Sequence, residues 1–91
     1  MSYIIQFSKD ADKIIEKYKK SNPVAYEKLF RLIPELAEHP RKGTGHPEPL
    51  VSGNDITYSR RISKRNRIVY DIYDDIIVVL IVYVEGHYND K

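Results

Sequence analysis

The sequence contains no cysteine and no long apolar segment. Without cysteine, the 91-residue chain can have no disulfide framework, no zinc site with thiolate ligands and no cysteine nucleophile. Its longest apolar run covers residues 76–83, whereas a membrane-spanning helix needs about 20 residues. Residues 1–7 also lack the basic start and long apolar region of a secretory signal peptide. We therefore expect a cytoplasmic protein that does not bind a membrane.

A large net charge is also absent from the whole chain, but not from each part of it. The formal net charge is only +2. Residues 39–67, however, carry seven Lys and Arg against two Asp and Glu, and five of the seven cations are Arg. Arg binds phosphate in a bidentate manner better than Lys does. This basic segment indicates either an anion-binding surface or an ordinary solvated one.

Hydrophobic periodicity predicts a single α+β domain over residues 1–91 in the order β-α-α-β-β-β. Strand patterns occur at residues 3–7, 56–62, 67–73 and 76–83. Between the first two of these, Ser8 and Asn22-Pro23 begin two helices, the second of which ends near residue 39. We expect the helices to form a hairpin on one face of a small, mostly antiparallel sheet. Residues 43–54 are predicted as a loop, and the last strand, apolar on both faces, as a central covered strand.

Glu48 is one candidate for chemistry. It lies between Pro47 and Pro49, which fix its backbone in a basic neighbourhood. A carboxylate held rigidly among cations can act as a general base. An exposed loop glutamate with no function is the alternative.

Three arginines are candidates for binding phosphate. Arg60 and Arg61 are consecutive in a predicted strand, so their side chains point to opposite faces. Arg67 begins the next strand after a short turn and should lie near one of them. Two guanidinium groups on one face would bind a phosphate, whereas charges that protect an edge strand from aggregation are the alternative.

His87 and Tyr88 follow the last predicted strand. Histidine exchanges a proton near neutral pH, and tyrosine donates hydrogen bonds or stacks on a base. A metal site built from His39, His46, Glu48 and His87 is disfavoured, because their spacing fits no common zinc or iron pattern. We expect no metal and no other cofactor.

A carboxylate, arginines, a histidine and a tyrosine form a complete set for metal-free RNA cleavage. The base would remove the proton of a ribose 2′-hydroxyl, whose oxygen then attacks the adjacent phosphorus. Arginine would stabilise the charge of the transition state, and the acid would protonate the leaving 5′-oxygen. DNA lacks the 2′-hydroxyl, so the substrate would have to be RNA.

Four sequence motifs resemble those of the YoeB/Txe toxins of the RelE superfamily, in the same order. Residues 43–50 resemble the G-x-G-x-P-E-P-L signature. The aromatic-S-R-R-I, R-[IL]-V-Y and C-terminal H-Y patterns of the family are matched by residues 58–62, 67–70 and 86–88. Any one motif is weak, but the set is specific. The resemblance covers nearly the whole chain and implies a RelE-like fold, with two helices on one face of the sheet.

The resemblance also implies an activity, namely ribosome-dependent cleavage of messenger RNA in the A site, which inhibits translation. Matched residue by residue, Glu48 takes the place of the general base and Arg67 that of the phosphate-stabilising arginine. His87 takes the place of the catalytic histidine, with Tyr88 beside it.

Further positions either match the family pattern or depart from it. Arg60 and Arg61 correspond to the paired arginines that assist at the family's site. His46 stands in the place of a family lysine and would partly replace its charge. The other departures from the family pattern are Val51, Tyr58, Glu85 and a three-residue tail after Tyr88.

The implied partner is a YefM/Axe-type antitoxin, whose disordered C-terminal segment wraps the toxin and blocks the site. Operator DNA would be bound only through that complex. As an alternative, toxins of the ParE type share the superfold and inhibit gyrase, and a degenerate toxin would retain only antitoxin binding and operator regulation. The first predicted helix places four lysines on one face, which either contact ribosomal RNA or are solvated: Lys9, Lys13, Lys17 and Lys20.

Overall fold

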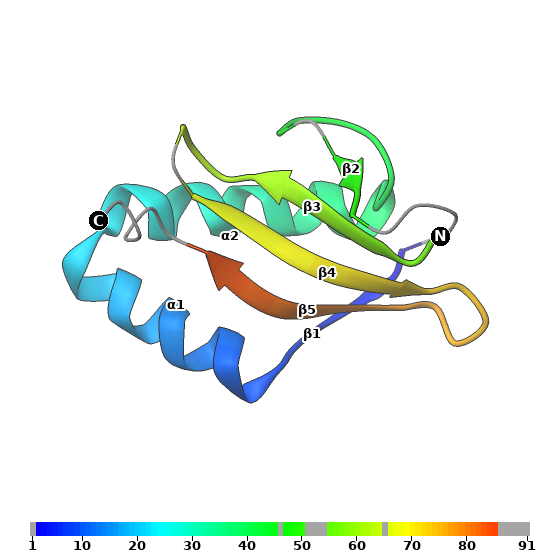
Figure 1. Cartoon of the computed structure of the whole chain (residues 1–91), viewed down its shortest axis with the longest axis horizontal. Helices are drawn as coiled ribbons and strands as arrows, with labels where there is room; N and C mark the ends of the chain where they lie inside the picture. Colours follow the sequence, from blue (N-terminus) through cyan, green and yellow to red (C-terminus); the bar gives the residue numbers. More distant parts are fainter. Residues whose placement is uncertain (1, 46, 51–54, 65, 86–91) are drawn as a thin grey trace.

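The computed structural model describes residues 2–45, 47–50, 55–64 and 66–85. Along the chain its elements are β1 (Ile4–Phe7), α1 (Lys9–Ser21), α2 (Pro23–Glu38), β2 (Glu48–Pro49), β3 (Thr57–Arg61), β4 (Arg67–Tyr73) and β5 (Val78–Glu85) (Figure 1). The predicted α+β class is confirmed, with two helices packed on a mixed sheet. In the part of the chain that is described, no helix is long and apolar enough to cross a membrane.

Both helices begin where the sequence predicts because polar side chains cap them. The Ser8 hydroxyl accepts a hydrogen bond from the N–H of Ala11 at 3.0 Å, and the Asn22 side chain accepts one from the N–H of Ala25 at 3.3 Å. Asn22 also ends α1, since its own N–H donates to the carbonyl of Tyr18. One residue therefore closes the first helix and opens the second, which joins them without an intervening loop.

The strands form one five-stranded sheet in the order β1-β5-β4-β3-β2. β1 pairs with β5 in parallel, and all other neighbours are antiparallel. The structure corrects two sequence predictions here. Part of the predicted loop, Glu48–Pro49, is a short edge strand. The sequence does not indicate this strand, because prolines flank Glu48 and proline has no N–H to donate to a neighbouring strand. The last strand begins at Val78 rather than at residue 76, since residues 74–77 form a turn in which Ile77 has a φ of 55°.

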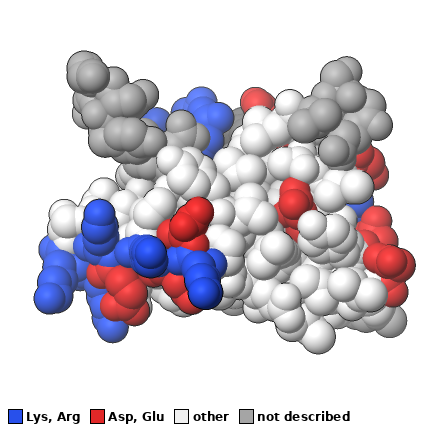
Figure 2. Space-filling model, turned by 60° about the horizontal axis from the view of Figure 1, so that its bottom comes forward, with Lys and Arg blue, Asp and Glu red and all other residues white. Residues whose placement is uncertain are grey.

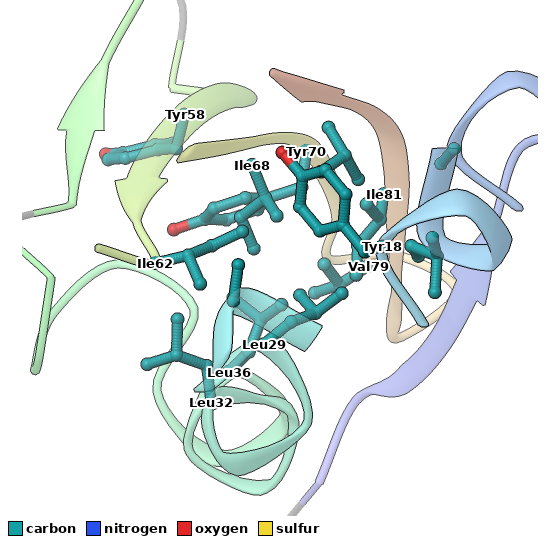
Figure 3. Packing of buried hydrophobic residues seen from close by; sticks show 14 of the residues in the cluster. Tyr18, Leu29, Leu32, Leu36, Tyr58, Ile62, Ile68, Tyr70, Val79 and Ile81 are labelled. Carbon is teal, nitrogen blue, oxygen red and sulfur yellow. The ribbon is translucent and has the colours of Figure 1, made fainter. Parts of the chain in front are cut away.

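The helices cover one face of this sheet. On β4 the side chains of Ile68, Tyr70 and Ile72 are fully buried, whereas the residues between them are only half-buried. Leu29 and Leu36 of α2 are also fully buried and belong to the same cluster (Figure 3). The second face is partly open, since Tyr83 of β5 is 38% exposed while Ser59 of β3 is buried; below we call it the open face. The last strand is central in the sheet, as predicted, but the expectation that both of its faces are covered is wrong.

Candidate active site

The register of the sheet places Glu48 on the open face. Glu48 of β2 pairs with Ser59 of β3, Ser59 pairs with Val69 of β4, and Val69 pairs with Tyr83 of β5. Residues directly opposite each other in a sheet project from the same face, so these four form one row across it. In this row Ser59 is buried and Val69 is half-buried, while Glu48 and Tyr83 are exposed. The exposure of Glu48 puts its side chain within reach of solvent and of a ligand on this face.

The next row of the open face contains two arginines. Arg61 of β3 pairs with Arg67 of β4, and Arg61 is exposed while Arg67 is half-buried. Opposed residues of an antiparallel pair have Cβ atoms about 5 Å apart, and like charges in that position repel each other. Glu48 occupies the diagonal position to Arg61, a separation of about 7–8 Å. An anion bound between the two guanidinium groups would relieve their repulsion, and it would lie beside the Glu48 carboxylate.

Arg60 points to the other face, as the period of the strand predicts. Its side chain is completely buried, and Nη2 donates to the carbonyls of His39 and Lys42, both at 2.8 Å. Nη1 lies 3.9 Å from the Glu35 carboxylate. The burial of Arg60 disfavours its predicted phosphate-binding role, because its guanidinium holds the end of α2 and the following loop.

The same loop explains the glycines of the Gly43-x-Gly45 motif. The Glu35 carboxylate accepts the backbone N–H of Thr44 at 2.7 Å, and chiefly this bond lowers the pKa of the Glu35 carboxyl group. Gly45 has a φ of 90°, and a Cβ there would lie 2.5 Å from the carbonyl oxygen of Arg61. The loop is therefore pressed against the end of β3, with the Arg61 N–H donating to the Gly45 carbonyl at 2.7 Å. This contact sets the chain on its path into β2 and Glu48.

A β-bulge in β5 turns Tyr83 toward the open face. The register shifts where Tyr70 pairs with Ile81 but Val69 pairs with Tyr83, so Val82 is the extra residue. Ile81 is buried in the core, and without the bulge Tyr83 would project to the same side. Bulges commonly re-aim side chains next to active sites. Ser59 lies opposite Glu48 in this row, and Tyr83 lies at its far end on β5. Neither was predicted as a site residue, and only the serine before the two arginines gave a signal.

Arg41, another cation of the basic segment, is used at the opposite end of the sheet. Its guanidinium lies 3.0 Å from Asp74 and 3.1 Å from Asp55, and 5.9 Å from the centre of the Tyr58 ring. The Tyr3 hydroxyl also donates to Asp74, at 2.5 Å. Arg41 first, and Tyr3 second, lower the pKa of Asp74. This network ties together four segments distant in the sequence. Among the described residues of the sheet, Arg61 and Arg67 are the arginines that project from the open face.

Three of the predicted site residues lie outside the described part of the chain: His46, His87 and Tyr88. Their proposed roles stay predictions. His39 lies at the C-terminal cap of α2, where its carbonyl accepts the bond from Arg60. Within the residues that the structure describes, no three histidine, aspartate or glutamate side chains gather as metal ligands.

The fold and the sequence both have relatives. Residues 7–88 match the family model described as the YoeB-like toxin of bacterial type II toxin-antitoxin system. A Toxin YoeB of Streptomyces coelicolor is 38% identical over 63 residues, which are 69% of this chain and 75% of the relative.

Solved structures agree with this match. A YoeB/ParE toxin from Agrobacterium tumefaciens superposes with a TM-score of 0.81 and 25% identity, over 93% of this chain and 99% of the other. The YoeB–YefM complex from Staphylococcus aureus gives a TM-score of 0.76 and 28% identity, over 97% and 100% of the two chains. The chain therefore belongs to the YoeB-like toxins of bacterial type II toxin–antitoxin systems.

Proposed function

We propose that this toxin is a ribosome-dependent endoribonuclease that cleaves messenger RNA in the A site and thereby inhibits translation. The observation that carries the proposal is the placement of Glu48, Arg61 and Arg67 on one open face of the sheet. Family membership supports the same assignment, because the match to the YoeB-like toxins covers residues 7–88 and so includes all three residues.

The mechanism follows from the chemistry of these groups. Glu48 removes the proton of the ribose 2′-hydroxyl, and the 2′-oxygen attacks the adjacent phosphorus. Arg67, with Arg61 opposite, stabilises the additional negative charge on the phosphate oxygens in the transition state. The bond from phosphorus to the 5′-oxygen breaks, and His87 donates the proton to that oxygen, with Tyr88 beside it. The products are a 2′,3′-cyclic phosphate and a free 5′-hydroxyl.

The ribosome supplies what the open face lacks. A face of a small sheet gives an RNA strand no deep pocket, so a larger machine has to hold and orient the substrate. Positive side chains gather over α1 at one end of the molecule, with acidic side chains between them (Figure 2). We propose that the lysines of this helix contact ribosomal RNA, an attraction that would weaken as salt increases.

The proposed partner is an antitoxin of the YefM type. The relative from Staphylococcus aureus was solved as a YoeB–YefM complex, and this chain matches it over 97% of its length. Such a partner would neutralise the toxin by covering the open face, and operator DNA would be bound only through the complex. We also propose that the toxin acts in the cytoplasm, where ribosomes are found.

Primer extension on ribosomes programmed with a defined message tests the proposed activity. We expect the wild type to cut within the A-site codon, and Glu48→Ala and His87→Ala to abolish the cut. Asp75→Ala, which removes an exposed carboxylate from the β4–β5 turn, is the matched control and should cut normally. Mapping 5′ ends of cellular transcripts after induction, wild type beside His87→Ala, extends the test to the cell.

Two results would overturn the proposal. Undiminished cleavage by both site variants would remove Glu48 and His87 from the mechanism. Inhibition of DNA supercoiling by a protein that leaves messages intact would instead indicate a toxin of the ParE type.

A further inference from the structure

A small depression adjoins the open face around the end of β3. Its volume is about 260 Å³, and it lies between α2, the loop before β2 and the residues that follow β3. Its apolar part is formed by Leu32 and Ile62, which are buried. Its polar lining consists of Lys28, Arg31, Thr44 and Arg61. We call these six residues the α2–β3 groove.

The polar lining of the groove is strongly cationic. Lys28 and Arg31 are three residues apart in α2 and so share one side of the helix, and both are exposed. The only carboxylate paired with either in the described residues is Glu27, 3.7 Å from Arg31, and both side chains are at least 70% exposed. An exposed pair of this kind is weak. The groove therefore keeps most of its positive charge.

The nearest further carboxylate on α2 is already used. Glu35 lies one helical turn after Arg31, but it accepts the N–H of Thr44 and lies 3.9 Å from Arg60. The buried guanidinium of Arg60 thus balances the charge of Glu35. Three cations remain to bind an anion, because the Thr44 side chain is itself hydrogen-bonded to the Glu35 carboxylate.

Size and position indicate which anion. Pockets for small molecules measure about 300–1,000 Å³, so this one suits a single small group such as a phosphodiester. Arg61 belongs both to the groove and to the pair with Arg67 on the open face. An RNA strand with its reacting phosphate at that pair would carry its neighbouring phosphate toward the groove.

We propose that the α2–β3 groove binds the backbone phosphate next to the one that is cleaved, through Lys28 and Arg31. The proposal rests on the proposed function, because it takes the bound strand to be the messenger RNA. Lys28 acts as a point charge, whereas Arg31 forms a paired hydrogen bond with two phosphate oxygens. The groove thereby fixes the direction of the strand across the open face.

A binding cycle tests this contact without depending on cleavage. All proteins carry Glu48→Ala, so that the message stays intact, and their affinity for programmed ribosomes is measured at equilibrium. The messages are either native or carry one uncharged methylphosphonate, placed on the 5′ or the 3′ side of the target linkage. The groove variant is Lys28→Ala/Arg31→Ala, and the charge-matched control on α1 is Lys13→Ala/Lys17→Ala.

We expect the methylphosphonate to weaken binding of the parent protein about tenfold in one of its two positions, as for the loss of a charge-assisted hydrogen bond. The groove variant should lose about as much with native message and nothing further with the modified one. The control should respond to the methylphosphonate as the parent does.

Other outcomes overturn the proposal. If the affinity losses of the groove variant and of the methylphosphonate are additive, the two changes act independently, which would mean that the groove contacts ribosomal RNA. Unchanged affinity of the groove variant would mean that it binds no RNA, as expected for a surface that takes an acidic peptide. Cleavage by the protein with Glu48 intact is assayed separately, so a failure of the proposed activity cannot be mistaken for a failure of the groove.

Discussion

Replacing Arg60 with methionine should destabilise the protein strongly, although the two side chains have similar lengths. The Arg60 side chain is fully buried and donates to two backbone carbonyls at 2.8 Å. Each hydrogen bond from a charged donor contributes about 1.5–3 kcal/mol net. Methionine fills the space but leaves the carbonyls of His39 and Lys42 without this donor.

Two further effects change the stability lost in Arg60→Met. Glu35 loses a cation 3.9 Å away, but its side chain is 31% exposed, so water partly replaces that attraction. In the opposite direction, Nε and Nη1 of Arg60 have no hydrogen-bond partner within the described part of the chain, and removing such groups offsets about 1–2 kcal/mol. The sum is a loss of about 3 kcal/mol. For a domain of this size that corresponds to a decrease in Tm of about 12–24 °C.

Urea denaturation followed by circular dichroism measures this loss, and calorimetry gives the Tm. Arg61→Met is the matched control, because the neighbouring arginine is exposed and such a substitution costs within about 0.5 kcal/mol. An Arg60→Met protein within about 1 kcal/mol of the wild type would refute the assignment of Arg60 to the structural support of the loop.

Three other predictions concern separate parts of the molecule. Arg41 and Tyr3 lower the pKa of Asp74 in the folded protein. The stability that Asp74 contributes is therefore present above its unfolded pKa of about 3.9 and is lost as the pH falls through the folded value. Asp74→Asn should flatten the dependence of the unfolding free energy on pH between about 5 and 3, and an unchanged slope would contradict this. Gly45→Ala should cost about 2 kcal/mol or more in urea denaturation, because its φ is 90° and the new Cβ would lie 2.5 Å from a carbonyl oxygen; a neutral effect would show that the loop is not pressed against β3. Lys13→Glu/Lys17→Glu should weaken binding to ribosomes in moderate salt, and unchanged affinity would reject a contact between α1 and ribosomal RNA.

The sequence by itself determined the features that depend on near neighbours. Ser8 and Asn22 begin the helices because a capping side chain reaches an N–H only three residues ahead. The opposite orientation of Arg60 and Arg61 follows from the period of any strand. These features need no knowledge of the rest of the chain, which is why they could be predicted correctly.

Only the tertiary structure decided which residues of neighbouring strands lie opposite each other. The period of a strand separates a more apolar face from a more polar one, but long-range pairing set Arg61 opposite Arg67 and Glu48 opposite Ser59. The sequence also contains no sign that Arg41 and Arg60 serve the fold, since burial depends on segments far away in the chain. β2 and the bulge at Val82 likewise exist through pairing with another strand. The sequence thus supplied the candidate base and the candidate phosphate-binding arginines, and the register of the sheet brought Glu48, Arg61 and Arg67 to one face.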